Sequence, residues 1–245
     1  VRQKVGDAEA LYPKLLPEAL IPKQGLVVKR VPVATQDGAP GGFYDGPSLD
    51  GSRPGTYWIN LRDMAAVARF RLPTLSFHEG VPGHHTQGSV ATAFGEAPLL
   101  LRIASFNAYQ EGWALYAERL MAEMGAYVDD PLGDLGRLQD ELFRAVRLVV
   151  DTGLHHKRWT REQAIRTMQD ITGIAEVRVI AEVERYMAWP GQALGYKLGQ
   201  LRLLDMREKF RARGGKNADL REFHGTVLEA GAMPLALVEQ RLGLV

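Results

Sequence analysis

The sequence contains no cysteine among its 245 residues, which excludes disulfide bonds, thiolate zinc sites and a cysteine nucleophile. It also has almost no excess of either charge, because 30 basic and 29 acidic residues leave a formal net charge of +1. No long-range field would therefore attract nucleic acid, and no basic stripe or nucleic-acid motif is present. No apolar run reaches the roughly 18 residues that a membrane helix needs, so we expect no membrane segment in this chain.

Two further features are missing. No G-x-S-x-G motif occurs, so a serine nucleophile on the usual strand-to-helix turn is not expected. The chain starts with Val1 and lacks the basic start and apolar stretch of a signal peptide. We therefore expect a piece of a longer protein, with a portion missing at its N-terminal side, and the compartment stays open.

Residues 1–72 differ from the rest of the chain. The first 60 residues contain seven prolines, and glycines are frequent between positions 38 and 55. Two short runs, Gly25–Pro32 and Thr56–Leu61, are rich in β-branched and aromatic residues and predict strands. We expect the second run to be an edge strand that pairs with an extended peptide, which makes Tyr57 and Asn60 candidate substrate-binding residues.

Residues 73–245 predict a helical body that carries the functional site. At Thr160, the sequence T-R-E-Q matches a capping box, with Gln163 at the third helical position. The fold class is therefore mainly α with a small β region. The expected helices begin near Pro73 and continue over about 98–125, 132–157, 161 onward, 175–187, 192–213 and 220–237.

The segment 77–87, FHEGVPGHHTQ, holds three of the six histidines and a glutamate beside the first of them. A His-Glu pair on a helix, followed by another histidine, is typical of zinc hydrolases of the H-E-x-x-H type. In that motif two histidines bind the metal and the glutamate takes a proton from water. The alternative is a helix end with three surface or capped histidines.

The spacing of these histidines departs from that motif. Position 82, where the second histidine would stand, is Pro82. In an unbroken helix, His84 lies about 240° round from His78, and His85 lies about 10.5 Å further along the axis. Pro82 cannot donate a backbone hydrogen bond and Gly83 tolerates unusual dihedrals, so we expect a bulge that brings His84 to the ligand position. His85 stays open as the alternative ligand.

The segment 110–118, QEGWALYAE, offers a third ligand. Glu111 has apolar and aromatic neighbours in the sequence, and a carboxylate in such surroundings is costly without a cation. Gly112 is expected to let the two motif helices approach closely around the site. Glu118 and Glu123 are interpreted as charges on a solvated face.

The two motifs, with the segments 149–164 and 189–200, resemble the bacterial family called domain of unknown function 885, grouped with the gluzincin metallopeptidases. QEGWALYAE is also similar to the N-E-G-F-A-x-x-x-E element of aminopeptidase N-type enzymes, whose first glutamate is the third zinc ligand. The Gly83-His84 pair resembles the Gly-His of thimet-type and Taq-type carboxypeptidases. The resemblance implies a gluzincin-like catalytic domain with one zinc ion on His78, His84 and Glu111. Family members are far longer, which implies a missing N-terminal helical portion.

Three more residues are candidates. Tyr196 resembles the tyrosine that gluzincins place opposite the metal, where its hydroxyl donates to the oxyanion, and an aromatic residue of the core or of a groove is the alternative interpretation. His155 shares a helix face with Asp151 and could act in catalysis, although a local surface interaction explains the pair equally well. Lys197 is a candidate for binding an anionic group of the substrate.

These residues predict a zinc-dependent peptide hydrolase in which Glu79 is the general base. The partner expected is a peptide or a small amide. A metal-dependent hydrolase of another amide or ester would use the same residues, and other divalent metals suit two histidines and a glutamate. A non-catalytic metal-binding or peptide-binding protein is the rival from another class, but such a protein has no use for Glu79 as a base.

Overall fold

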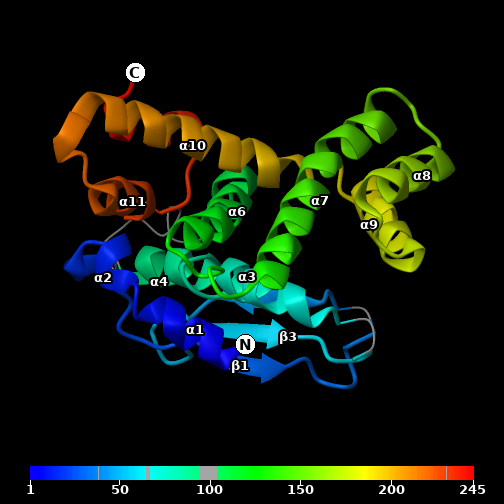
Figure 1. The fold of residues 1–245 in the computed structure, drawn as a ribbon, viewed down its shortest axis with the longest axis horizontal. Coiled ribbons are helices and arrows are strands. Elements are labelled where there is room, and N and C mark those ends of the chain that lie inside the picture. The colour runs from blue at the N-terminus through cyan, green and yellow to red at the C-terminus, as the bar shows by residue number, and fades with distance from the viewer. Residues whose placement is uncertain (38, 65–66, 94–103, 230) are drawn as a thin grey trace.

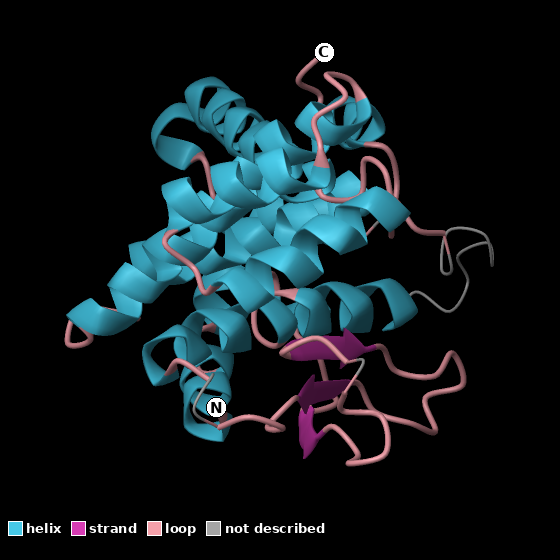
Figure 2. Cartoon of the chain, turned by 90° about the vertical axis from the view of Figure 1, so that its right-hand side faces the viewer, coloured by secondary structure: helices cyan, strands magenta, loops and turns pink. Residues whose placement is uncertain are grey.

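The computed structural model describes the chain from residue 1 to 245 apart from residues 38, 65–66, 94–103 and 230. Helices form most of the molecule, and a three-stranded sheet lies along one side of them (Figures 1 and 2). The expectation of a mainly α fold with a small β region is confirmed. Within the described residues, no helix is both long and apolar enough to cross a membrane.

The sheet has the strand order β1-β3-β2. Strands β1 (Val27–Arg30) and β3 (Thr56–Ile59) are parallel, and β2 (Gly42–Asp45) runs antiparallel to β3. The prediction of an edge strand at 56–61 is therefore wrong, because β3 is the central strand and both of its sides are already paired. The strand β2 was not predicted, since its glycine-rich surroundings resemble a loop.

Two N-terminal helices, α1 (Arg2–Glu9) and α2 (Tyr12–Leu15), were also not predicted. Their buried side chains join a core that includes Phe77 and Trp113, so this core links residues on both sides of position 72. A 3-10 turn, η1 (Glu18–Leu20), leads from α2 toward the sheet.

The helices that carry the candidate site follow a second 3-10 turn, η2 (Arg69–Arg71). Pro73 lies in the first turn of α3, where a missing N–H costs nothing. Asp130 caps α7 by accepting a hydrogen bond from the Gly133 N–H, and Pro131 follows it. In this part of the chain lie α3 (Leu72–Glu79), α4 (His84–Ala93), α6 (Asn107–Glu123) and α7 (Pro131–His155), and α10 (Leu194–Gly214), described below, completes the site. The first residues of the helix expected over 98–125 lie outside the described part of the chain.

The second half of the chain contains the remaining helices. The capping box is confirmed, because the Thr160 side chain accepts from the Gln163 N–H and Gln163 accepts from the Thr160 N–H. The stretch 220–237 is not one helix, since Pro234 lies at the N-cap of a separate one. The elements are α8 (Arg161–Thr172), α9 (Glu176–Ala188), α10 (Leu194–Gly214), η3 (Gly215–Asn217), α11 (Leu220–Leu228) and α12 (Leu235–Arg241).

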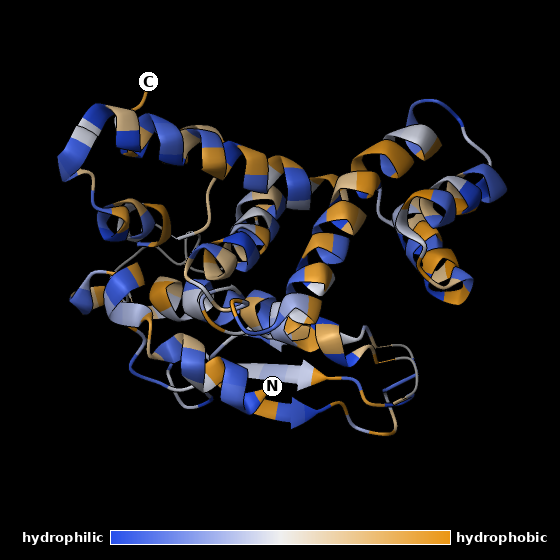
Figure 3. Ribbon diagram, viewed as in Figure 1, coloured by the Kyte–Doolittle hydropathy of each residue, from blue (hydrophilic) through white to orange (hydrophobic). Residues whose placement is uncertain are grey.

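Helices α7, α8 and α9 share a second core around Phe143, Val150 and Tyr186. In Figures 1 and 3, α8 and α9 extend to one side of α7, whereas α6 and α10 pack on each other at the other side. The candidate site is built where α3, α4, α6, α7 and α10 meet.

Candidate metal centre

The helix that carries His78 breaks before the second histidine, as predicted. Helix α3 ends at Glu79 and α4 begins at His84, with a turn between them. The His85 N–H donates to the Gly80 carbonyl at 3.2 Å, five residues back, so the regular four-residue ladder is interrupted. The Val81–Pro82 peptide bond in this turn is cis.

Glycine is required at position 83 because a side chain has no room there, and not because the backbone adopts a positive φ angle. A Cβ atom at this position would lie 1.9 Å from the His78 carbonyl oxygen and 2.3 Å from that of Phe77. The turn is fixed from the other side by Trp113 of α6, whose Nε1 donates to the Pro82 carbonyl at 2.9 Å. These contacts fold α4 back, so that its first residue faces the end of α3.

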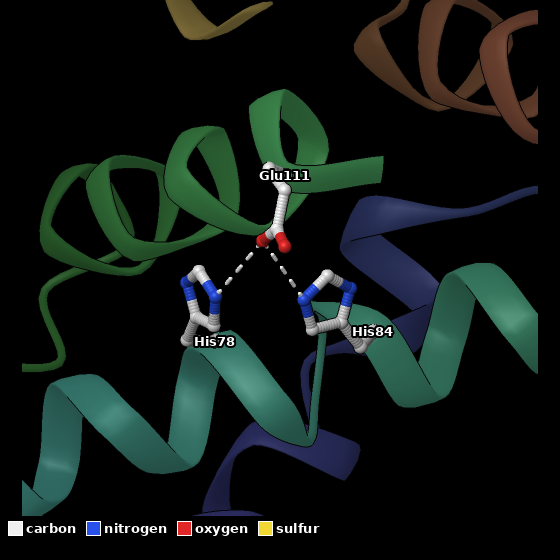
Figure 4. Close-up of side chains that lie close together, drawn as sticks. All are labelled: His78, His84 and Glu111. Atoms are coloured by element: carbon white, nitrogen blue, oxygen red, sulfur yellow. Dashed lines mark ion pairs between the residues drawn. The ribbon is translucent and has the colours of Figure 1, made fainter. Parts of the chain in front are cut away.

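The break brings His78, His84 and Glu111 together, as Figure 4 shows. Glu111 Oε2 lies 3.6 Å from His78 Nε2 and 3.4 Å from His84 Nε2. Each of the three residues offers one ligand atom, and these atoms lie within 4.8 Å of one another. Three atoms so spaced have a common point about 2.0–2.4 Å from each of them, close to zinc–ligand distances of about 2.0–2.2 Å.

The surroundings of the Glu111 carboxylate indicate whether a cation fits this point. Its Oε2 atom is buried and has no hydrogen-bond partner among the described residues, although two imidazoles face it. A buried carboxylate oxygen without a partner is costly. Two imidazole nitrogens and a carboxylate oxygen are a donor set that zinc accepts, so the residues present fit a divalent metal ion.

Charges are strongly coupled in the metal-free site. Burial disfavours the charged form of His78, but Glu111 and Glu118 outweigh burial and raise the pKa of His78 to about 9. Burial likewise opposes ionisation of Glu111, yet His78 and His84 hold the pKa of that carboxyl well below its usual range. A positive charge between these side chains is thus favoured, and a metal ion would supply it.

His85, the alternative ligand, lies outside this group. Its Nδ1 atom is 3.2 Å from the Tyr44 hydroxyl and 3.4 Å from Ser89 Oγ. Burial lowers the pKa of His85 to about 4, so the ring stays neutral. His84 is therefore the histidine that the fold directs toward Glu111.

Glu118 is the residue that the sequence interpretation misplaced. It is 1% exposed, and its Oε1 atom accepts a hydrogen bond from His78 Nδ1 at 2.8 Å. A proton held at Nδ1 leaves the Nε2 lone pair free for a metal. Glu111 and Glu118 are seven residues apart, hence two turns along one face of α6, and this spacing is the signal that could have identified Glu118. Glu123 is exposed, as the sequence interpretation expected, and it forms an ion pair with Arg207 of α10 at 2.7 Å.

Tyr196 does lie beside the site. Its ring stacks on His78, with centroids 6.2 Å apart and planes 14° apart. Gln192, which was not predicted, donates from Nε2 to the Tyr196 hydroxyl at 3.3 Å and approaches Glu111 Oε1 at 3.5 Å. Burial and the nearby Glu111 carboxylate raise the pKa of Tyr196, so its hydroxyl keeps its proton. That proton remains available for another acceptor.

Gly112 permits a close helix contact, but not the one expected. A Cβ atom at Gly112 would lie 2.5 Å from the Cα atom of Gly199, so the contact is between α6 and α10. This contact holds the start of α10, and with it Tyr196, against the helix that carries Glu111.

Three predicted residues lie elsewhere. His155 donates from Nε2 to the Tyr186 carbonyl at 3.0 Å, and Asp151 accepts from the Gly191 N–H, so the pair is structural and does not reach the ligands. Lys197 Nζ donates to Glu141 Oε1 at 2.6 Å and links α10 to α7. Asn60 donates to the Gln36 and Ala39 carbonyls and shapes a loop.

Tyr57 and Glu79 are both buried near the ligands. Tyr57 is 0% exposed on the central strand, so it offers no surface to a substrate. Glu79 is 7% exposed and forms no hydrogen bond or ion pair within the described residues, although its charge acts on His78 and on Tyr57. A buried carboxylate of this kind is able to accept a proton from a water molecule.

A cavity of about 410 Å³ opens beside His84 and Glu111. Its walls come from β2 and the loop after it, from α4 and from α6. Tyr44, Gln87 and Gln110 provide polar groups, whereas Pro47, Leu49 and Ala91 provide apolar ones. The site therefore has room for a ligand of a few residues' size next to the candidate metal position.

The fold and the site together define a helical protein with a candidate His-His-Glu metal centre. The chain belongs to the family described as bacterial protein of unknown function (DUF885), whose sequence model matches residues 1–242. No curated protein matches it.

Two of the solved structures that match the chain show the shared fold. A Colwellia psychrerythraea protein is 55% identical with a TM-score of 0.95, and a Shewanella oneidensis protein is 26% identical with a TM-score of 0.81. Each is described as a "putative lipoprotein", the second as one of unknown function. The matches cover 99% and 98% of this chain but only 41% and 44% of those chains. The chain therefore spans less than half the length of these relatives.

Proposed function

We propose that this chain carries the catalytic centre of a zinc-dependent peptide hydrolase of the gluzincin type. The observation that carries the proposal is the convergence of His78, His84 and Glu111 from three helices on one point. A structural zinc site usually has four protein ligands, whereas three leave a position for water or substrate. The cavity lined by His84 and Glu111 supports the proposal, because it places space for a substrate beside two of the three ligands.

A divalent cation bound there would lower the pKa of a water molecule and polarise a carbonyl group. Glu79 follows His78 at the end of α3, and no hydrogen bond or ion pair to the described residues occupies its carboxylate. In the proposed mechanism Glu79 takes a proton from the attacking water and returns it to the leaving amine. This role needs a buried, unpaired carboxylate, which Glu79 provides.

Tyr196 would stabilise the negative charge that develops on the carbonyl oxygen. Its hydroxyl accepts from Gln192 Nε2 and therefore has its own proton free to donate. The ring stacks on His78 and also packs against the Arg147 guanidinium, which lies 4.4 Å from the ring centroid. A donor fixed before the reaction costs no reorganisation when charge develops.

The test is hydrolysis of a mixture of unstructured peptides by the purified chain, before and after removal of metal by a chelator. We expect cleavage that is lost on chelation and restored by zinc, with no cleavage by His84→Ala. Zinc binding without cleavage of any peptide or simple ester would favour a binding protein. Cleavage that survives both chelation and His84→Ala would contradict the proposal.

A further inference from the structure

A series of buried charges leads from His78 to helix α7. Glu118 Oε1 accepts from His78 Nδ1 at 2.8 Å, and the same oxygen lies 3.2 Å from Arg144 Nη2. Glu118 is 1% exposed and Arg144 is 8% exposed. One carboxylate oxygen is therefore shared between the imidazole of His78 and a buried guanidinium.

Arg144 is itself held from its other side. Its Nη1 atom donates to the Asp140 carbonyl at 3.2 Å and lies 3.4 Å from the Asp140 carboxylate. That carboxylate also pairs with Arg71, which ends the turn η2 just before α3. Two acids and two arginines thus alternate, so the buried series is balanced in charge without counting His78.

The series joins the three elements that must be aligned for His78 to act. His78 and Arg71 belong to α3 and the turn before it, Glu118 to α6, and Asp140 and Arg144 to α7. An imidazole rotates about its side-chain bonds unless its second nitrogen is held. Partners of this kind fix both the ring orientation and the tautomer of a histidine that binds metal.

We propose that Arg144 is a positioning residue for the metal centre, which it serves through Glu118. Arg144 holds the Glu118 carboxylate in place, and Glu118 holds the proton of His78 at Nδ1, so that Nε2 faces Glu111. This inference rests on the proposed metal centre, but it concerns residues that contact neither the metal nor the substrate. Without Arg144, Glu118 would be a buried carboxylate with a single hydrogen bond, because its Oε2 atom has no partner among the described residues.

The experiment measures zinc affinity, by competition with a chelator, and the visible spectrum of the cobalt-substituted chain. We expect Arg144→Met to weaken zinc binding by roughly 10–100-fold, the usual effect of losing an outer partner of a ligand. Arg144→Lys keeps a cation beside Glu118 and should recover part of the loss. Arg137→Met is the matched control, since Arg137 lies on the same helix but pairs with Asp134 and Glu141, and its affinity should stay at the wild-type value.

A double-mutant cycle tests the route through Glu118. If Arg144 acts through Glu118, the Glu118→Gln, Arg144→Met double variant should bind zinc no more weakly than Glu118→Gln alone. Fully additive losses would overturn the proposal, as would wild-type affinity and an unchanged cobalt spectrum in Arg144→Met. If Arg144→Met does not fold, Arg144→Lys takes its place, and affinity equal to wild type in that variant would also overturn it.

The two proposals fail in different ways. A wild-type chain that binds no zinc removes the metal centre, and the role of Arg144 with it. A wild-type chain that binds zinc while the Arg144 variants bind equally well leaves the metal centre intact and removes only the positioning role.

Discussion

A Cβ atom on Gly83 would lie 1.9 Å from the carbonyl oxygen of His78, far inside any van der Waals contact. The second histidine reaches the site only because the chain turns back directly over the end of α3. Any side chain at position 83 would push α4 away from α3 and separate His84 from His78.

Gly83→Ala is therefore expected to lower both stability and metal affinity. We expect a loss of at least about 2 kcal/mol, which corresponds to about 4–8 °C in Tm for a chain of this size. Gly6→Ala is the control, because nothing lies within 4 Å of a Cβ at that helical position. Thermal unfolding monitored by circular dichroism checks the comparison, and equal Tm values for the two variants would contradict it.

The sequence predicted the features that depend on neighbouring residues. The capping box at Thr160 needs only Gln163, and the break at Pro82 needs only the missing donor of proline. The preference for His84 followed from the expected break and from the Gly-His resemblance, and it left His85 open as the alternative. These are short-range effects, so they can be predicted before the distant contacts are known, although Trp113 of α6 also holds the turn at Pro82.

The features that were missed depend on distant contacts. Nothing within Thr56–Ile59 says that β1 and β2 pair on both sides of it, so its central place could not be read locally. Glu118 shares a face of α6 with Glu111, but whether that face is solvated depends on α3 and α7 packing against it. Gly112 was recognised as a close-contact residue, yet its partner Gly199 is 87 positions further along the chain.

Zinc-affinity measurements on alanine variants should distinguish the roles of the adjacent residues His84 and His85. His84→Ala should reduce zinc affinity by orders of magnitude, because it removes one of three ligands. His85→Ala should bind zinc close to normally, since His85 contacts Tyr44 and Ser89 and not Glu111. Zinc content after dialysis, measured by atomic emission, distinguishes them, and a reversed order would exchange the roles of the two residues.

His224 should make the chain less stable in acid. It is fully buried, with Nδ1 donating to the Leu15 carbonyl and Nε2 accepting from the Tyr116 hydroxyl, and burial lowers its pKa to about 4. The unfolded chain takes up this proton near pH 6.5, so the contribution is complete above that pH and is lost as the pH falls toward about 4. The loss amounts to about 3 kcal/mol.

Replacing His224 by Gln should remove this pH dependence while keeping a polar side chain. Urea unfolding of the metal-free wild type and of His224→Gln at pH 7.5 and pH 4.5 gives the four free energies needed. We expect the wild type to lose about 2–3 kcal/mol more than the variant between the two pH values. Parallel losses in both proteins would show that His224 is not the responsible group.

Glu79 and Glu111 should respond differently to the same substitution. Glu79→Gln keeps the size of the side chain but removes the base, so zinc content should stay near normal while peptide hydrolysis falls by roughly 10²–10⁴-fold. Glu111→Gln should lose zinc first and activity in consequence. Equal loss of zinc in both variants would make Glu79 a ligand, and full activity of Glu79→Gln would exclude it as the base.

Tyr196→Phe tests the proposed stabilisation of the oxyanion, with His155→Ala as its control. The phenyl ring can still stack on His78 and under Arg147, so zinc affinity and Tm should change little. Only the hydroxyl is lost, and a donor that acts on charge developing in the transition state affects kcat more than KM. We expect kcat for a peptide substrate to fall by about 10²–10³-fold, the usual effect of removing one such donor.

His155 donates to the Tyr186 carbonyl, away from the three ligands, so its alanine variant should keep kcat within a few-fold of wild type when assayed well below its Tm. If Tyr196→Phe keeps its kcat while KM rises, the hydroxyl binds substrate without contributing to the transition state. If kcat falls as far in His155→Ala as in Tyr196→Phe, the result would support the interpretation of His155 as a catalytic residue that the sequence suggested.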